Sequence, residues 1–364
     1  MLQTPLINFH RDAGARLVEF AGWEIPVYYE GLIKEHLYTR QHASVFDVSH
    51  MGRVEFRGDD AGALLERLCT RRVGDMQVGQ CRYSQMCRED GGILDDVIVS
   101  RFDDHYLVIC NASNRAKLLD WWDRHRHGLA VKIIDKTMET AMVAIQGPDA
   151  IGTMDELLPL DIAGLKRYHF ITGNVLGGDY YVARTGYTGE DGVEIILPAH
   201  LAHTALHMLL SQSAERGRPV KPAGLGARDT LRTEAGMPLY GHELSEDWDP
   251  LTAGQGWCVS FDKDFIGKAA LERIRQTGPK EKLIGLEVRS KRTPRPGALL
   301  LADQQPVGRV TSGITSPTLG KVIAMGFVRA DLSEPGTGLE IDIGRARLPA
   351  AVVSLPFYKR PKKA

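Results

Sequence analysis

The sequence after residue 275 carries the feature that most restricts the fold, a series of short apolar segments interrupted by glycine and proline. These segments are KLIGLEV (282–288), PVGRVTSG (306–313), VIAMGFV (322–328) and GLEIDIG (338–344). Their length is typical of strands, and their spacing is typical of all-β sandwiches and barrels. We therefore predict an all-β terminal domain over residues 275–364, connected through the polar stretch RIRQTGPKEK (273–282).

The residues before this region alternate between helical and strand-like patterns. Apolar residues recur at helical spacing in 59–73 and 114–127, while 97–101 and 105–110 read as the two strands of a hairpin. This mixture predicts an α+β sandwich over residues 51–139. The chain has 364 residues, more than the ~250–300 at which single cores stop growing, so several domains are expected.

Two adjacent aspartates open one of the predicted strands, GGILDDVIV (91–99). Aspartate is depleted in strands, and a buried carboxylate is costly unless it is hydrogen-bonded or paired. Because side chains alternate along a strand, Asp95 and Asp96 point to opposite faces. One interpretation is an aspartate that caps the turn at the two glycines, and the other is a carboxylate that meets a polar, nitrogen-rich ligand. Periodicity does not say which aspartate would do so.

Two further charged residues stand in apolar or glycine-rich surroundings. Glu194 lies between Val193 and Ile195 in the strand-like end of GYTGEDGVEI, and Arg228 lies at the start of the predicted helix ARDTLRTEAG. A cation at a helix start opposes the helix dipole, so an anionic neighbour is expected. Glu194, Arg228 and Asp96 are therefore predicted to form one polar cluster, and the alternative is a structural ion pair that joins two domains.

Composition and missing motifs exclude several classes of protein. A formal net charge of −1 disfavours general binding to nucleic acid or membrane surfaces. The N-terminus lacks an apolar signal core and no run of ~18 apolar residues occurs, so we predict a cytoplasmic, non-membrane protein. The five cysteines form no CxxC pair, so neither disulfides nor zinc are expected. The phosphate-binding, dinucleotide-binding, HExxH and GxSxG motifs do not occur.

Two histidine features require separate consideration. His125 and His127 flank an arginine, and cation-rich surroundings disfavour a bound metal, so no metal site is predicted. His50, in DVSHMG, has two interpretations: a general base or a structural histidine with satisfied hydrogen bonds.

Seven long motifs, in order along nearly the whole chain, resemble the aminomethyltransferase family of the glycine cleavage system, the T-protein. They are LVEFAGWEIPVYY (17–29), RQHASVFDVSHMG (40–52), GGILDDVIV (91–99), IQGP (145–148), GYTGEDGVEI (186–195), GLGARDTLRTEAGMPLYG (224–241) and VTSGITSPTLGKVIAMGFV (310–328). Seven ordered motifs are much more specific than any single one.

This resemblance implies a fold and a reaction. The fold would be a three-domain cloverleaf around a central folate channel, with a discontinuous first domain (1–50 plus 140–274), an α+β domain (51–139) and an all-β C-terminal barrel (275–364). The enzyme would transfer the one-carbon unit of the aminomethyl-lipoyl arm of H-protein to tetrahydrofolate. The products would be 5,10-methylenetetrahydrofolate, ammonia and dihydrolipoyl H-protein. Tetrahydrofolate would be a substrate, no metal would be needed, and the enzyme would be a monomer.

The resemblance also implies roles for particular residues. Asp96 would face the reacting nitrogens of the folate while Asp95 stays structural, and Glu194 would bind the aminopyrimidine edge of the pterin. A carboxylate suits that edge because it accepts two parallel N–H donors. The remaining residues implied to line the folate site are Arg228, Tyr83, Met51, Asn111 and Tyr187. Tyr358 directly follows Phe357, whereas some relatives carry a later tyrosine, so it receives no role.

Two related functions remain as alternatives. One is a tetrahydrofolate-dependent demethylase of the same fold, and the other is a non-catalytic folate-binding relative. Members of the second kind carry a KCxxGQ motif, and the nearest string here, AGQGWC (253–258), lacks the lysine. The basic residues Lys359, Arg360, Lys362 and Lys363 form either a solvated tail or a docking patch for an acidic partner such as H-protein.

Overall fold

The structure, a computed structural model, describes residues 1–175 and 177–361. Contacts between Cα atoms divide the chain into two compact units. The first unit comprises Met1–Leu64, Val73–Arg82 and Val97–Asp229, and the second comprises Leu65–Arg72, Tyr83–Asp96 and the chain from Thr230 onward. The three domain boundaries stated above stay a prediction.

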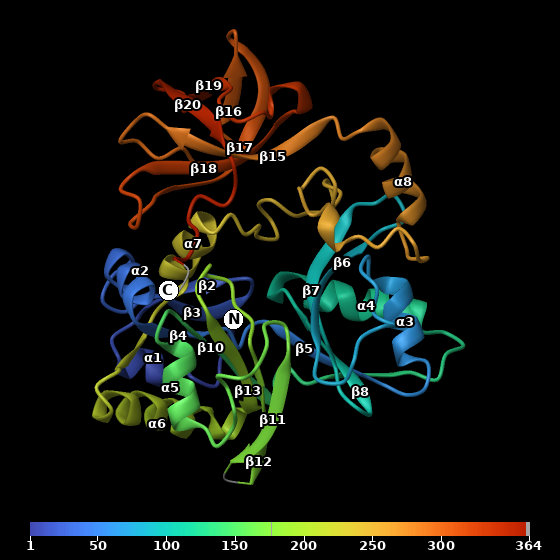
Figure 1. Ribbon diagram of the computed structural model, residues 1–364, viewed down its shortest axis with the longest axis vertical. Coiled ribbons are helices and arrows are strands. Elements are labelled where there is room, and N and C mark those ends of the chain that lie inside the picture. Colours follow the sequence, from blue (N-terminus) through green and yellow to red (C-terminus); the bar gives the residue numbers. More distant parts are fainter. Residues whose placement is uncertain (176, 362–364) are drawn as a thin grey trace. The chain divides into compact units, whose positions relative to one another are not determined.

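A six-stranded sheet forms the centre of the first unit (Figure 1). Its order is β11-β12-β13-β10-β4-β14, and all pairs are antiparallel except β14 with β4. The strands are β4 (Ala43–Asp47), β10 (Thr140–Gln146), β11 (Phe170–Val175), β12 (Gly178–Ala183), β13 (Gly192–Pro198) and β14 (Val220–Pro222). The sheet thus joins residues near 45 to residues beyond 140.

Helices and a small sheet accompany this larger sheet. Leu206, on α6, and Met154, on α5, are buried in one apolar cluster with the strand residues Val45, Val143 and Val182. The helices here are α1 (Ile7–Asp12), α2 (Leu32–Gln41), α5 (Ala150–Leu157), α6 (Ala202–Glu215) and α7 (Leu225–Glu234). A three-stranded sheet of order β1-β3-β2 is formed by β1 (Leu2–Gln3), β3 (Trp23–Tyr28) and β2 (Arg16–Phe20).

A second mixed region contains a five-stranded sheet of order β6-β7-β8-β5-β9. The strands are β5 (Gly52–Arg57), β6 (Cys81–Cys87), β7 (Ile93–Arg101), β8 (His105–Cys110) and β9 (Lys132–Asp135), and the helices are α3 (Ala61–Leu68) and α4 (Arg115–His125). The predicted hairpin is confirmed, since β7 and β8 pair from Ile98 with Ile109 to Arg101 with Tyr106. The α+β fold class is therefore confirmed.

The C-terminal strands close into a barrel of order β15-β18-β17-β16-β19-β20, which confirms the predicted all-β barrel (Figure 1). Its interior is apolar, with Leu286, Leu300 and Ile341 fully buried. The strands are β15 (Glu281–Val288), β16 (Leu299–Ala302), β17 (Gln305–Thr315), β18 (Val322–Arg329), β19 (Gly338–Asp342) and β20 (Arg347–Val353).

Several glycines lie inside the barrel strands rather than between them. A Cβ on Gly308 would lie 2.1 Å from the carbonyl oxygen of Phe327, and one on Gly326 would lie 2.5 Å from that of Arg309. Closely packed neighbouring backbones, and not turns, therefore require glycine at these two positions.

The predicted linker 273–282 is wrong for most of its length. Helix α8 (Lys268–Thr277) continues through its first half because Ala270 and Leu271 are buried, and β15 begins at Glu281. Gly278, with φ +77°, ends the helix, so the actual connection is only residues 278–280. In the described part of the chain, no helix is long and apolar enough to cross a membrane.

Candidate active site

Glu194 occupies a central position of the large sheet in the first unit. It lies on β13, opposite Ala144 of β10 on one side and Ala183 of β12 on the other. Its side chain is buried, with 7% exposure, and it accepts a hydrogen bond of 2.6 Å from the hydroxyl of Thr185. The predicted strand position is confirmed, and a carboxylate held in this way is costly unless further donors approach it.

Arg228 lies in the first turn of α7, as predicted, and close to the Glu194 charge. Burial lowers the pKa of Arg228, while the negative charge of Glu194 acts in the opposite direction. The guanidinium carbon lies 5.0 Å from the centre of the Tyr187 ring. One nitrogen, Nη1, is buried without a hydrogen-bond partner. The anionic neighbour expected for this cation is therefore Glu194.

Met51 belongs to a turn after β4, which we call the 47–51 turn. The Val48 amide donates to the Met142 carbonyl over 3.0 Å, and the Met51 amide donates to the Val48 carbonyl over 3.1 Å. The Ser49 amide donates to Asp47 over 2.9 Å, and the Ser49 hydroxyl bonds both backbone groups of Met142. The backbone of this turn is thus fixed at nearly every residue.

The fully buried Arg53 holds the same turn from the adjoining strand β5. Its Nη1 donates to the carbonyl of Ser49 over 3.0 Å and also to that of Met51. Its other nitrogens donate to the Thr140 hydroxyl over 2.7 Å and to the carbonyls of Thr137 and Thr140. The guanidinium therefore has a structural role in positioning Met51, and it is not available to a ligand.

Asn111 directly follows strand β8, at the point where the chain turns into a short 3₁₀ helix (Ala112–Asn114) and then α4. Its carbonyl accepts the amide of Asn114 over 3.1 Å. The side chain is half-buried, which is compatible with the predicted ligand contact. That contact stays a prediction.

The aspartate pair lies on β7 in the second unit, and the two carboxylates differ in exposure. Asp95 is fully buried, whereas Asp96 is partly exposed. Burial raises the pKa of Cys258 to about 12, and the charge of Asp96 acts in the same direction, which places that carboxylate near the thiol. The alternation predicted for the strand is thus observed, and Asp96 is the member of the pair that a ligand could reach.

Tyr83, on β6 in the same unit, forms an aromatic platform with a residue that the sequence reasoning missed. Its ring stacks on Trp257 with centroids 5.3 Å apart and an interplanar angle of 24°. Trp257 is 57% exposed, and the Arg71 guanidinium lies 5.5 Å from its ring centre. In the sequence, the one available signal is a tryptophan between glycine and cysteine in GQGWC, and its exposure is seen only in the structure.

The structure therefore brings some predicted residues together within each unit. Glu194, Arg228 and Tyr187 gather in the first unit, and Tyr83 gathers with Trp257 in the second. A buried carboxylate beside an unsatisfied guanidinium and an aromatic ring suits a flat heterocycle with both donors and acceptors. That Asp96 belongs to the same cluster as Glu194 stays a prediction.

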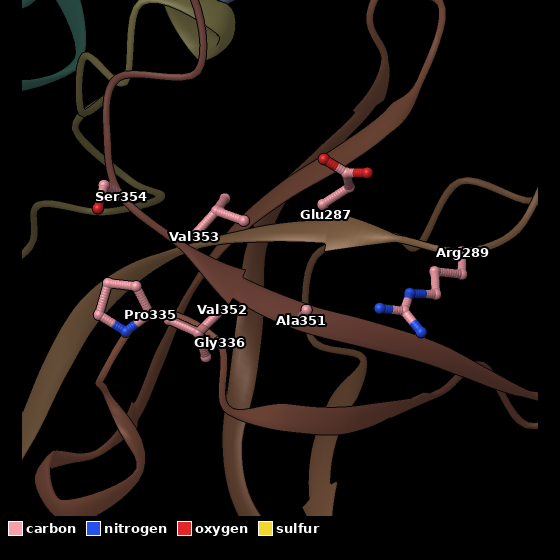
Figure 2. A pocket seen from close by; sticks show the side chains of 8 residues that line it. All are labelled: Glu287, Arg289, Pro335, Gly336, Ala351, Val352, Val353 and Ser354. Atoms are coloured by element: carbon pink, nitrogen blue, oxygen red, sulfur yellow. The ribbon is translucent and has the colours of Figure 1, made fainter.

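A hollow of about 490 Å³ lies on the barrel (Figure 2). Figure 2 shows Glu287 from β15, Arg289 just after that strand and Val353 at the end of β20 around it, and its eight lining residues include no predicted site residue. Within residues 1–175 and 177–361, no three His, Cys, Asp or Glu side chains gather as a metal site would need.

Two family models match the chain, one for each part. The GCVT N-terminal domain matches residues 6–263. The glycine cleavage T-protein C-terminal barrel domain matches residues 281–359, which contain the closed barrel.

Full-length relatives agree with these matches. The chain is 45% identical to an aminomethyltransferase of Rubrobacter xylanophilus over 99% of this chain and 95% of the relative. It is 42% identical to an aminomethyltransferase of Geobacillus kaustophilus over 99% of both chains. Among solved structures, the glycine cleavage system aminomethyltransferase T of Bartonella henselae matches with a TM-score of 0.92 and 33% identity, covering 98% of each chain.

Proposed function

The chain belongs to the glycine cleavage T-protein family, and on that premise we propose that it is a tetrahydrofolate-dependent aminomethyltransferase. The donor would be aminomethyl-lipoyl H-protein and the acceptor tetrahydrofolate. The observation that carries the proposal is Glu194, a buried carboxylate on β13 whose charge acts on Arg228, an arginine with an unpartnered Nη1. The chain is similar to aminomethyltransferases over nearly its whole length.

The residues of the first unit fit the ring system of a folate. The Glu194 carboxylate would accept the two parallel N–H donors of the aminopyrimidine edge. Arg228 carries a buried Nη1 without a partner, which would donate to an acceptor on the same ring. Tyr187, against which Arg228 lies, supplies aromatic surface. Met51 and Asn111 are the other proposed lining residues of this unit, and Tyr83, in the second unit, is a proposed lining residue through the resemblance alone.

The reaction balances without a metal or an oxidant. The bond between the lipoyl sulfur and the one-carbon unit breaks, and so does the bond from that carbon to its amine. Two bonds form from the carbon to N5 and N10 of tetrahydrofolate. The protons released from N5 and N10 are accounted for by the thiol of dihydrolipoate and by ammonia.

Asp96 is the proposed catalytic residue. As the donor carbon ionises towards an iminium, positive charge develops on it, and a nearby carboxylate stabilises that charge. The same carboxylate can orient a folate nitrogen by accepting its N–H. Carboxylates are weak bases, so strong proton abstraction is not the assigned role. Positioning supplies much of the rate because two bulky carriers must meet at one carbon.

A binding experiment tests the folate assignment. Calorimetric titration of tetrahydrofolate into Glu194→Gln should give a dissociation constant at least about tenfold above that of the wild type, a loss of ~1.4 kcal/mol. Glu190→Gln is the matched control because Glu190 is also buried in the first unit but pairs with Arg40 over 2.9 Å. Equal affinities for wild type and Glu194→Gln would remove Glu194 from the site.

A turnover experiment tests the reaction and the role of Asp96. With aminomethyl-lipoyl H-protein as donor, Asp96→Asn should bind tetrahydrofolate nearly as the wild type does and turn over about 10²-fold more slowly. A protein that leaves this donor unreacted but transfers the methyl group of a methyl-oxygen or methyl-sulfur donor, giving 5-methyltetrahydrofolate, would favour the demethylase alternative. Near-normal turnover of the variant would end the proposed role of Asp96.

The H-protein partner, the monomeric state and the cytoplasmic location belong to the same proposal. Lys359 and Arg360 are exposed and could contact an acidic partner, while Lys362 and Lys363 lie outside the described residues. Removing residues 359–364 should weaken association with H-protein, measured by surface plasmon resonance. Unchanged association would leave the tail as a solvated segment.

A further inference from the structure

His50 lies within the 47–51 turn and has a polar atom without a hydrogen-bond partner in the protein. Its side chain is 5% exposed, and its ring packs edge-on against Phe20 with centroids 5.7 Å apart at 87°. The ring nitrogen Nδ1 is buried and has no hydrogen-bond partner in the protein. Buried polar groups nearly always have a partner, so a partner from outside the chain is expected here.

The turn holds this nitrogen in place. Backbone groups on both sides of His50 are fixed, because Arg53 donates to the carbonyls of Ser49 and Met51. The backbone that carries the imidazole is therefore held by a fully buried arginine, and the ring itself packs against Phe20. In this turn, Nδ1 of His50 is a buried polar atom without a partner in the protein, which suits a binding residue.

The charges near His50 keep the imidazole neutral. Burial lowers its pKa to about 4, the Asp47 charge acts in the opposite direction, and the Arg228 and Arg53 charges lower it further. A neutral imidazole can accept a hydrogen bond at one nitrogen. The charge of Arg228 is thus one of those that act on His50.

Two unsatisfied groups thus occur in one unit, Nη1 of Arg228 and Nδ1 of His50. The first can only donate, whereas the second can accept. Together they match a ligand edge on which a carbonyl oxygen stands beside an N–H. A reduced pterin has such an edge at O4 and N5, next to the aminopyrimidine donors assigned to Glu194.

We propose that His50 is a substrate-binding residue whose Nδ1 accepts the N5–H of the reduced pterin while Arg228 donates to O4. This inference rests on the proposed function, since it names the contacts of the same substrate. In this role, His50 would orient N5, one of the two nitrogens that receive the one-carbon unit.

Three variants test the position of the nitrogen. Asparagine carries a polar atom near the place of Nδ1, glutamine carries one near the place of Nε2, and leucine carries none. Tetrahydrofolate should bind about tenfold more weakly to His50→Leu and His50→Gln, and His50→Asn should stay within about threefold of the wild type, because only asparagine restores the acceptor. Melting temperatures check that each variant folds.

A second ligand isolates the contact to N5. 5-Methyltetrahydrofolate has no N5–H, so wild type, His50→Asn and His50→Gln should bind it with equal affinity. If the His50→Leu variant does not fold, the inference is tested by comparing the tetrahydrofolate affinities of His50→Asn and His50→Gln. Equal tetrahydrofolate affinity in these two variants and the wild type would overturn the inference and leave a bound water as the partner of Nδ1. Failure of the wild type itself to bind tetrahydrofolate would instead refute the proposed function.

Discussion

Removing the negative charge of Glu243 should strongly destabilise the second unit. Its carboxylate is fully buried and pairs with the buried Arg232 over 2.8 Å. It also accepts the amide of Leu239 over 3.0 Å and the hydroxyls of Thr311 and Ser312 over 2.5 and 2.6 Å. Glutamine keeps the shape, but one of its terminal atoms is a donor that faces other donors.

The size of the effect follows from the unpaired cation. Removing one partner of a buried ion pair costs about 3–5 kcal/mol, because Arg232 stays desolvated without its counter-charge. For a unit of this size, each kcal/mol lowers the melting temperature by roughly 2–4 °C, so Glu243→Gln should lower it by about 6–20 °C. The double variant Arg232→Met, Glu243→Leu should lose less than the single one because no buried charge is left unpaired.

Scanning calorimetry measures these differences, with Glu287→Gln as the matched control. Glu287 pairs with Lys321 on the barrel over 3.0 Å, but its side chain is 42% exposed. Such a surface pair contributes about 0–1 kcal/mol, so the control should melt nearly as the wild type does. A Glu243→Gln protein as stable as the control would refute the reasoning about the buried pair.

Three other predictions concern the first unit. Gly147→Ala should cost about 3 kcal/mol or more in urea unfolding, since φ is +133° and the new Cβ would lie 1.9 Å from the His42 carbonyl oxygen; normal stability would contradict this. Burial alone would raise the pKa of Asp47, but hydrogen bonds, chiefly from His10, lower it to about 2. The contribution of the Asp47 carboxylate to the free energy of unfolding should be complete above pH ~4 and should be lost as the pH falls through about 2. In acid unfolding, Asp47→Asn should not show this loss of stability. Burial lowers the pKa of His50 from 6.5 to about 4, so the unfolded chain binds the extra proton. Stability should therefore fall as pH drops from ~6.5 towards 4, by about 2 kcal/mol at pH 5, and a similar fall in His50→Asn would contradict the assignment.

Local sequence patterns were sufficient to predict whether many segments are helices or strands, but not which strands pair with one another. The barrel segments could be located because strand-like runs alternate with turn residues. The pairing of β4 with β10 joins residues about a hundred positions apart, and nothing in either segment specifies the other. The predicted linker takes in the second half of helix α8, because this half is polar and the buried residues Ala270 and Leu271 lie in the first half.

Residues of the candidate site could be predicted where a charged side chain occurs in a sequence context that disfavours its charge. Glu194 inside an apolar strand and Arg228 at a helix start both stood out for this reason. Arg53 did not, because an arginine in a strand of alternating polarity reads as exposed, and its burial depends on Thr137 and Thr140 far along the chain. Trp257 became recognisable only through its contact with Tyr83.

The arginine-held turn also bears on how fast a ligand can be captured. Many binding loops become ordered only when the ligand arrives, and that loss of chain entropy weakens binding and can slow association. In the 47–51 turn the ordering takes place during folding, since Arg53, Ser49 and Met142 fix the backbone of the free protein. For this segment, collision frequency and orientation, rather than rearrangement of the chain, would limit the rate at which substrate enters.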